Sequence, residues 1–202
     1  MPTIFDELLG LCRAYLAGLG GEATRFAGAA GGWLPARELE PMSLPCLRHL
    51  EGLAQSAAQR ERPILALLAR NHARMRWGQT YTTADFAPHF LDNYGWLELI
   101  GTRGHFACDR LAAGFLILGP GIVYPDHHHV AEELYVPLSG AADWRKGGGG
   151  FMRRAAGEVI HHPSMVNHAM RTHGEPLIAL YLWRGGPLAE KSTVTGKAGA
   201  QA

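Results

Sequence analysis

The sequence predicts a mainly β domain preceded by an α-helical segment, and two patterns carry this prediction. Up to residue 76, apolar residues recur at intervals of three and four, as in Ile4, Leu8, Cys12 and Leu16, which is the period of an amphipathic helix. From Gly78 on, short β-rich runs are separated by Gly, Pro and Asp at intervals of about eight to twelve residues. That spacing is typical of an all-β sandwich or barrel.

The expected organisation has three parts. A helical segment over residues 1–76 packs on a barrel over residues 77–190, and a flexible tail of small and polar residues follows at 191–202. The 202 residues, 47% of them hydrophobic, suit a single core. The glycine-rich stretch GLGGEATRFAGAAGGWLP is expected to be a loop. The KGGGG stretch at residues 146–150 is expected to be a hairpin loop between two strands.

Charge and cysteine content exclude several classes of protein. The 19 Lys and Arg residues balance 18 Asp and Glu residues without a long basic run, so neither nucleic acid nor a membrane surface is expected as a partner. Cys12, Cys46 and Cys108 are odd in number and form no CxxC pair, which argues against disulfides and thiolate zinc sites. The start of the chain lacks the pattern of a signal peptide, and no run of about 18 uncharged apolar residues occurs. We therefore expect a cytoplasmic protein.

The stretch YPDHHHVAEELYVPLSG, residues 124–140, carries the strongest chemical signal. Side chains alternate across a strand, so His127 and His129 face one way and His128 the other. Steps of two from His129 lead to Glu133 and then to Tyr135. Two imidazoles and a carboxylate that converge in this way suit a divalent metal ion.

A second stretch, GEVIHHPSMVNHAM, lies about thirty residues further on and offers the missing ligand. One of His161, His162 and His168 is expected to complete the set. Nitrogen and oxygen ligands without thiolate suit Zn, Fe, Mn, Ni or Co, and ligand type alone does not choose among them.

These two stretches resemble the two motifs of the cupin superfamily. His127-x-His129-x3-Glu133-x6-Gly140 is similar to the first motif, and Gly157-x5-Pro163-x4-His168 is similar to the second. The resemblance implies a double-stranded β-helix, a small jelly-roll barrel. It also implies one divalent transition metal inside the barrel, held by His127, His129, Glu133 and His168, and a structural role for His128, His161 and His162.

The chain departs from the second cupin motif at two positions. Met165 stands where that motif has a glycine, and Thr172 stands where it has an asparagine. Both changes concern turn geometry more than ligand identity, so the expected metal set is unchanged.

A narrower resemblance is to the cupin-type dimethylsulfoniopropionate lyases. It rests on the Tyr-Pro-x-His-x-His-x-x-x-Glu-x-Tyr run, on HAMRT after the last ligand and on the LYLWRG strand, and it covers residues 77–186. The resemblance implies a carbon–sulfur lyase that cleaves dimethylsulfoniopropionate (DMSP) to dimethyl sulfide and acrylate. It further implies Tyr135 as the base, Tyr124 as a second catalytic and substrate-binding tyrosine, and Trp183 as a substrate-binding residue.

That chemistry explains why these residue types are needed. The proton alpha to the carboxylate of DMSP is weakly acidic, and a divalent metal that binds the carboxylate stabilises the charge left by its removal. A tyrosine, whose pKa is ordinarily about 10, becomes a usable base if a cation lowers that value. Aromatic faces attract the sulfonium; Trp183 and Tyr124 are the first candidates, ahead of Tyr181, Trp144 and Trp77.

Two other functions fit the same ligand set. The chain is either a different metal-dependent cupin enzyme, such as a dioxygenase or isomerase of another small carboxylate, or a non-catalytic cupin that binds a small ligand. The sequence leaves open the native metal, a homodimer, and whether the N-terminal helices form a lid or a dimer contact.

Overall fold

The computed structural model describes residues 3–28 and 36–196. Short helices fill the N-terminal part: α1 (Ile4–Leu19), α2 (Gly21–Ala27), the 3-10 helix η1 (Pro45–Leu50), α3 (Leu53–Ser56), α4 (Arg62–Asn71) and the 3-10 helix η2 (His72–Arg74). α5 (Pro88–Leu91) lies further along, between strands. Thr3 begins α1 with a capping box, in which its hydroxyl accepts from the Asp6 backbone N–H and the Asp6 carboxylate accepts from the Thr3 backbone N–H.

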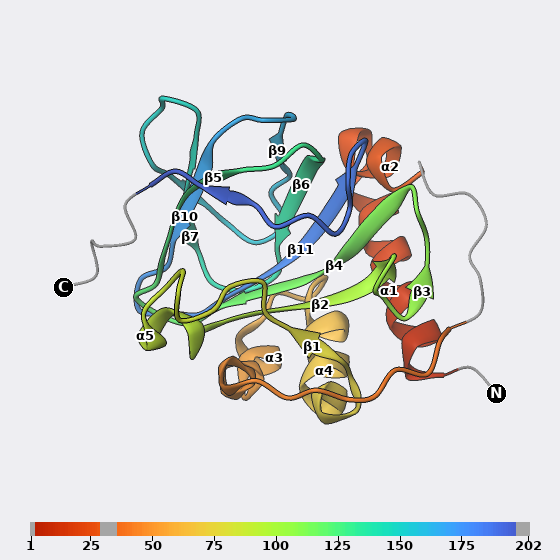
Figure 1. The fold of residues 1–202 in the computed structure, drawn as a ribbon. Coiled ribbons are helices and arrows are strands. Elements are labelled where there is room, and N and C mark those ends of the chain that lie inside the picture. The colour runs from red at the N-terminus through yellow and green to blue at the C-terminus, as the bar shows by residue number, and fades with distance from the viewer. Residues whose placement is uncertain (1–2, 29–35, 197–202) are drawn as a thin grey trace.

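The strands form two sheets that face each other and are antiparallel except for the parallel pair β2–β3 (Figure 1). The larger sheet has the order β1-β2-β4-β11-β6-β9, with β3 paired to β2, and the smaller has the order β12-β5-β10-β7-β8. Their bounds are β1 (Trp77–Gly78), β2 (Tyr94–Gly101), β3 (Phe106–Ala107), β4 (Leu111–Leu118), β5 (Val123–His128), β6 (Glu132–Pro137), β7 (Ala142–Lys146), β8 (Met152–Arg154), β9 (Ile160–His162), β10 (His168–Arg171), β11 (Leu177–Arg184) and β12 (Thr193–Val194). This architecture confirms the expected fold, a cupin-type jelly-roll barrel preceded by helices.

The larger sheet is buried on both faces, which explains its long apolar runs. Along β11, Leu180 and Leu182 belong to a core shared with the N-terminal helices, whereas Ala179 and Tyr181 belong to a second core inside the barrel. In Figure 1 the helices α1 to α4 lie outside the barrel, along the larger sheet. The inner face of the larger sheet is therefore the one that lines the barrel.

The structure corrects two expectations about local structure, one for an expected loop and one for an expected strand. Residues 21–27, expected to be part of a loop, form helix α2, because Ala23 and Phe26 are buried one turn apart against the core. The rest of that expected loop, residues 29–35, lies outside the described residues. The run QTYTT, residues 79–83, is one of the short β-rich runs that predict strands, but it is irregular here, and the Gln79 side-chain amide donates to the carbonyls of Leu91 and Tyr94.

The C-terminal segment contributes to the barrel. Thr193–Val194 forms β12, which pairs with β5, and the Thr195 and Gly196 backbone N–H groups donate to the Asp126 carbonyl. Part of the stretch expected as a flexible tail is thus bonded to the strand that carries His127. Residues 197–202 of that stretch lie outside the described residues. No helix of the described part combines the length and apolarity needed to cross a membrane.

Candidate active site

Three buried side chains meet inside the barrel. His129, Glu133 and His168 each bring one ligand atom, and these atoms lie within 4.8 Å of one another. Oε2 of Glu133 lies 3.0 Å from Nε2 of His129 and 3.2 Å from Nε2 of His168. The three residues are at most 6% exposed, so the carboxylate lies between two imidazoles away from water.

Strand pairing explains why residues far apart in sequence converge here. β10 pairs with β5, which places His168 opposite His127, and β11 pairs with β6, which places Trp183 opposite Glu133. His129 follows β5 in the turn that leads to β6. Paired positions point to the same face of a sheet, so all of these side chains project into the barrel.

The two departures from the second cupin motif have structural roles. Met165 takes a left-handed backbone conformation with φ of 62°, where a glycine would be unstrained, and its N–H donates to the carbonyl of His129 at 3.0 Å. The buried hydroxyl of Thr172 donates to the Gly119 carbonyl at 2.6 Å and accepts from the N–H of Ile122 at 2.8 Å. Both positions therefore fix turns beside the site.

The histidines are oriented by backbone carbonyls. Nδ1 of His127, His129 and His168 lies 2.8, 2.8 and 2.9 Å from the carbonyl oxygens of Pro125, Ala131 and Val166, respectively. A carbonyl only accepts, so each Nδ1 carries a proton and each Nε2 is left for another partner. Such an arrangement, with one ring nitrogen anchored, is typical of metal-binding histidines.

The charges of the cluster balance one another. Burial alone would raise the pKa of Glu133, but His129 and His168 hold it well below its ordinary value. Burial opposes the charged form of His129, yet the Glu133 carboxylate raises the pKa of that imidazole. Burial and the neighbouring His168 hold the pKa of His127 well below its ordinary value. A buried anion among imidazoles is an environment that favours a cation.

These residues fit a divalent transition metal. The donors are imidazole nitrogen and carboxylate oxygen without thiolate, and the buried Nε2 of His168, 3.2 Å from Oε2 of Glu133, makes no hydrogen bond of good geometry. His127 lies beside the group of three, with its ring centroid 4.1 Å from that of His168 and 6.4 Å from that of His129. It is not one of the three residues whose ligand atoms lie within 4.8 Å of one another, although its ring is close to that of His168.

Trp183 and Tyr135 flank the cluster. Nε1 of Trp183 donates to Oε1 of Glu133 at 2.5 Å, and its ring stacks on that of His129 with centroids 4.0 Å apart. Tyr135 lies two residues after Glu133 on β6 and is 5% exposed. Burial raises the pKa of Tyr135 well above its ordinary value, and the Glu133 carboxylate raises it further.

Tyr124 joins the site to an aromatic group that sequence reasoning missed. Its ring stacks on that of His127 with centroids 3.9 Å apart, and its hydroxyl lies 2.7 Å from the hydroxyl of Tyr81. Tyr94 packs against both tyrosines. Tyr81 comes from a segment without regular structure, so no periodicity in the sequence pointed to it.

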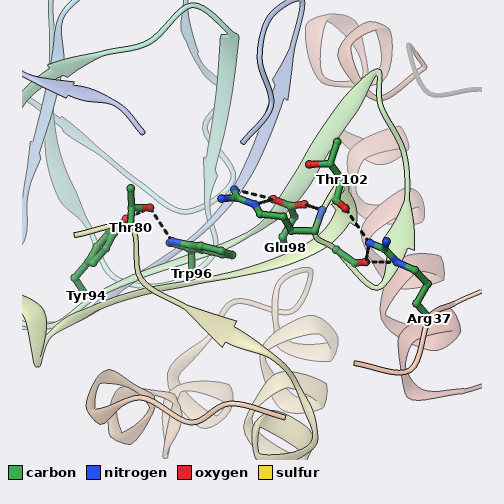
Figure 2. A network of polar contacts seen from close by, with 8 residues as sticks. Arg37, Thr80, Tyr94, Trp96, Glu98 and Thr102 are labelled. Atoms are coloured by element: carbon green, nitrogen blue, oxygen red, sulfur yellow. Dashed lines mark hydrogen bonds and ion pairs between the residues drawn. The ribbon is translucent and has the colours of Figure 1, made fainter. Parts of the chain in front are cut away.

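One pocket opens onto these residues. Its lining includes His127, Glu133, Tyr124, Tyr135 and Trp183, which the sequence predicted for the site, and Trp96, Glu98 and Arg103, which it did not. Figure 2 shows Trp96 and Glu98 side by side on β2, with the indole N–H of Trp96 donating to Thr80 at 3.0 Å. The pocket thus combines Glu133 of the cluster and the neighbouring His127 with aromatic walls and two further carboxylates, Glu98 and Glu190.

The remaining histidines of the two motifs fall into two groups. Nδ1 of His128 lies 2.9 Å from the side-chain oxygen of Asn167, and Nε2 of His161 lies 2.7 Å from Glu132, both outside the cluster. His162 instead projects inward opposite Glu133, and its ring stacks on that of His168 with centroids 4.2 Å apart. The sequence grouped it with the other two because it did not reveal the β6–β9 register.

A family model for dimethylsulfoniopropionate lyase matches residues 25–179, which is more than half of the chain. The chain belongs to this family. Over 110 residues, 54% of its length, it is 40% identical to the DMSP lyase DddQ of Ruegeria pomeroyi. Over 120 residues, 58% of its length, it is 30% identical to the putative DMSP lyase DddL of Cereibacter sphaeroides. These alignments cover 55% and 49% of the relatives, so the chain spans about half the length of the curated relatives it matches.

Solved structures of the family match over nearly the whole chain. The crystal structure of DddQ from Ruegeria pomeroyi DSS-3 is similar with a TM-score of 0.83 and 31% identity, and the match covers 95% of this chain and 96% of that one. A chain from the crystal structures of the DMSP lyases RdDddP and RnDddQII gives a TM-score of 0.84 at 28% identity, over 95% of this chain and 97% of that one. The helical N-terminal part is therefore common to these relatives.

Proposed function

We propose that this chain is a metal-dependent carbon–sulfur lyase that cleaves DMSP to dimethyl sulfide and acrylate. The observation that carries the proposal is the meeting of His129, Glu133 and His168, whose carboxylate lines a pocket together with Tyr135 and other aromatic side chains. Membership of the DMSP lyase family supports the same reaction.

In the proposed metal site, His129, Glu133 and His168 hold one divalent transition metal, and His127 stands beside them as a fourth candidate ligand. When bound there, such a cation would stabilise the charge that develops on the substrate carboxylate and would lower the pKa of a nearby phenol. Glu133 stays charged without a metal, because its two imidazole neighbours hold its pKa low. The metal-free chain therefore has a preformed anionic position for a cation.

Tyr135 is the proposed base. Its side chain lines the same pocket as Glu133, and its pKa without a metal lies well above the ordinary value. Once this pKa is lowered, Tyr135 acts as a phenolate and takes the alpha proton. The carbon–carbon double bond of acrylate then forms, and the carbon–sulfur bond breaks with its electron pair passing to sulfur. The leaving dimethyl sulfide is neutral, so no acid is needed on that side of the pocket.

Trp183 and Tyr124 are the proposed walls around the substrate. Trp183 holds Glu133 through its indole N–H and covers His129, while Tyr124 covers His127. Aromatic faces attract a sulfonium and exclude water from the reacting carbon. Their side chains thereby serve both the metal ligands and the substrate.

The test is release of dimethyl sulfide into the headspace from purified protein of known metal content that is given DMSP. We expect dimethyl sulfide and acrylate in equal amounts, loss of release on chelation and recovery on metal addition. No release from metal-loaded protein would refute DMSP as the substrate. Oxygen consumption with other small carboxylates would then favour a dioxygenase, because elimination uses no oxygen.

A further inference from the structure

The end of the pocket formed by β2 holds a buried ion pair. Oε1 of Glu98 accepts from the backbone N–H of Arg103 at 2.7 Å, and Oε2 accepts from Nε and Nη2 of Arg103 at 3.2 and 3.0 Å. The Glu98 side chain is 2% exposed, whereas that of Arg103 is 45% exposed. The carboxylate is thus fixed inside the barrel, and its cation comes from the solvent side.

The loop after β2 is shaped around this carboxylate. Gly101 has φ of 146°, and a Cβ there would lie 2.4 Å from Oε1 of Glu98. Arg37, from the N-terminal segment, holds the loop from outside through the carbonyls of Thr102 and Gly104 (Figure 2). A separate part of the chain therefore supports the ion pair, as expected for a built site.

The aromatic ring beside Glu98 completes a cation site. The guanidinium of Arg103 lies 4.7 Å from the ring centroid of Trp96, and the indole N–H of Trp96 is held by Thr80 at 3.0 Å. A carboxylate and an aromatic face together bind cations well when water is excluded. Arg103 occupies the place that another organic cation would take.

Sheet register connects this cation site to the proposed base. Glu98 pairs with Gly114, Gly114 pairs with Tyr181, and Tyr181 pairs with Tyr135, all in one row of the larger sheet. Gly114 contributes no side chain to this row, and Glu98, Tyr181 and Tyr135 all line the same pocket. Glu98, Tyr181 and Glu133 line one pocket, and both carboxylates add to the effect of burial in raising the pKa of Tyr181.

We propose that Glu98 and the face of Trp96 bind the cationic end of the substrate, and that Arg103 holds this position until the substrate replaces it. The identity of that cation as a sulfonium rests on the proposed function. A buried carboxylate without a cation is costly. Arg103 is half exposed, so its guanidinium withdraws into water at lower cost. A neutral ligand that displaces Arg103 leaves the Glu98 carboxylate without a cation. The pocket therefore selects for ligands with a positive charge.

The exchange also explains release of the products. Breaking the carbon–sulfur bond leaves its electron pair on sulfur and turns a sulfonium into a neutral sulfide. The sulfide no longer balances the charge of Glu98, so Arg103 returns to the carboxylate and to the face of Trp96.

Two ligands that differ in charge at one atom test this inference by calorimetry on the metal-loaded protein. They are 3-(trimethylammonio)propionate and 4,4-dimethylpentanoate, in which a quaternary carbon replaces the nitrogen. We expect the cationic ligand to bind at least about tenfold more tightly. Glu98→Gln should remove most of this preference. Arg103→Gln should strengthen binding of the cationic ligand. It should lower Tm in the ligand-free protein but not when the cationic ligand is bound.

Arg145→Gln is the matched control. Arg145 is also partly exposed, pairs with Asp126 and lies over Phe151, but it does not line the pocket. Arg145→Gln should leave the preference for the cationic ligand unchanged. Equal binding of the two ligands by the parent protein would overturn the inference. An Arg103→Gln variant that binds the cationic ligand no more tightly than the parent would overturn it too, and this second test does not require Glu98→Gln to fold. None of these outcomes depends on cleavage of DMSP, so failure of the proposed reaction is seen separately.

Discussion

The indole N–H of Trp183 donates to Glu133 across the β11–β6 pair, at 2.5 Å, while the opposite oxygen of that carboxylate lies between two histidines. One side chain thus orients the carboxylate of the cluster and forms a wall of the pocket. The binding of a metal and the shape of the substrate site are consequently coupled through this contact.

Replacement of Trp183 by Phe should weaken metal binding. The variant keeps an aromatic ring beside His129 but loses the hydrogen bond to Glu133, and loss of such a support typically lowers metal affinity about 10–100-fold. Trp144→Phe is the matched control, because Nε1 of Trp144 is buried in the same core without a hydrogen bond. Metal titration against a competing chelator measures the metal affinity of both variants. Equal affinity in Trp183→Phe and the parent would contradict the role given to this contact.

The histidines of the first motif should differ in importance. His129 belongs to the group of three ligand atoms within 4.8 Å, whereas His127 stands beside it. His129→Ala should therefore remove most of the bound metal, and His127→Ala should retain more of it. Metal content after dialysis gives the comparison. If His127→Ala loses as much metal as His129→Ala, the two residues contribute equally as ligands.

Metal binding should release protons, and the number released per metal ion bound should be larger at low pH. In the metal-free chain Glu133 raises the pKa of His129, so this imidazole keeps its proton to a higher pH than the ordinary value of about 6.5. A metal must displace that proton, so apparent affinity rises with pH until the raised pKa is passed. Calorimetry in buffers of different ionisation enthalpy counts the protons. Release that is absent at about pH 6 would show that His129 is not a ligand.

Gly114 should be intolerant of any side chain. A Cβ at this position would lie 1.8 Å from the carbonyl oxygen of Leu97 on the paired strand, so β2 and β4 would have to separate. We expect Gly114→Ala to lower the free energy of unfolding by about 3 kcal/mol or more. Gly148→Ala, where nothing lies within 4 Å, should change it by less than about 0.5 kcal/mol. Urea unfolding of the two variants decides the matter.

The sequence predicted the barrel because strand signals are local. Runs such as GFLILGPG and LIALYLW are apolar throughout and bounded by turn residues, and they form β4 and β11. Helix α2 was missed because its glycine-rich surroundings outweigh a seven-residue helix that is stabilised by the burial of Ala23 and Phe26. Local propensity is a weak guide where tertiary packing decides.

The candidate site was predictable only where its residues share a motif. The residues from His127 to Tyr135 span the end of β5, a short turn and the start of β6, so one continuous stretch of sequence contains them. Glu98 reaches the same pocket through the order β2-β4-β11-β6, which no short spacing encodes. His162 was left out for the same reason, since its inward direction follows from its pairing with Glu133.

The measurement that tests the central claim most directly is dimethyl sulfide release by Tyr135→Phe at a metal content matched to the parent. Tyr181→Phe is the control, because Tyr181 is buried on the neighbouring strand directly opposite Tyr135. The account predicts at least about a hundredfold loss of turnover in Tyr135→Phe, since the proposed base is removed. It also predicts a much smaller loss in Tyr181→Phe. Near-parental turnover by metal-loaded Tyr135→Phe would contradict the account.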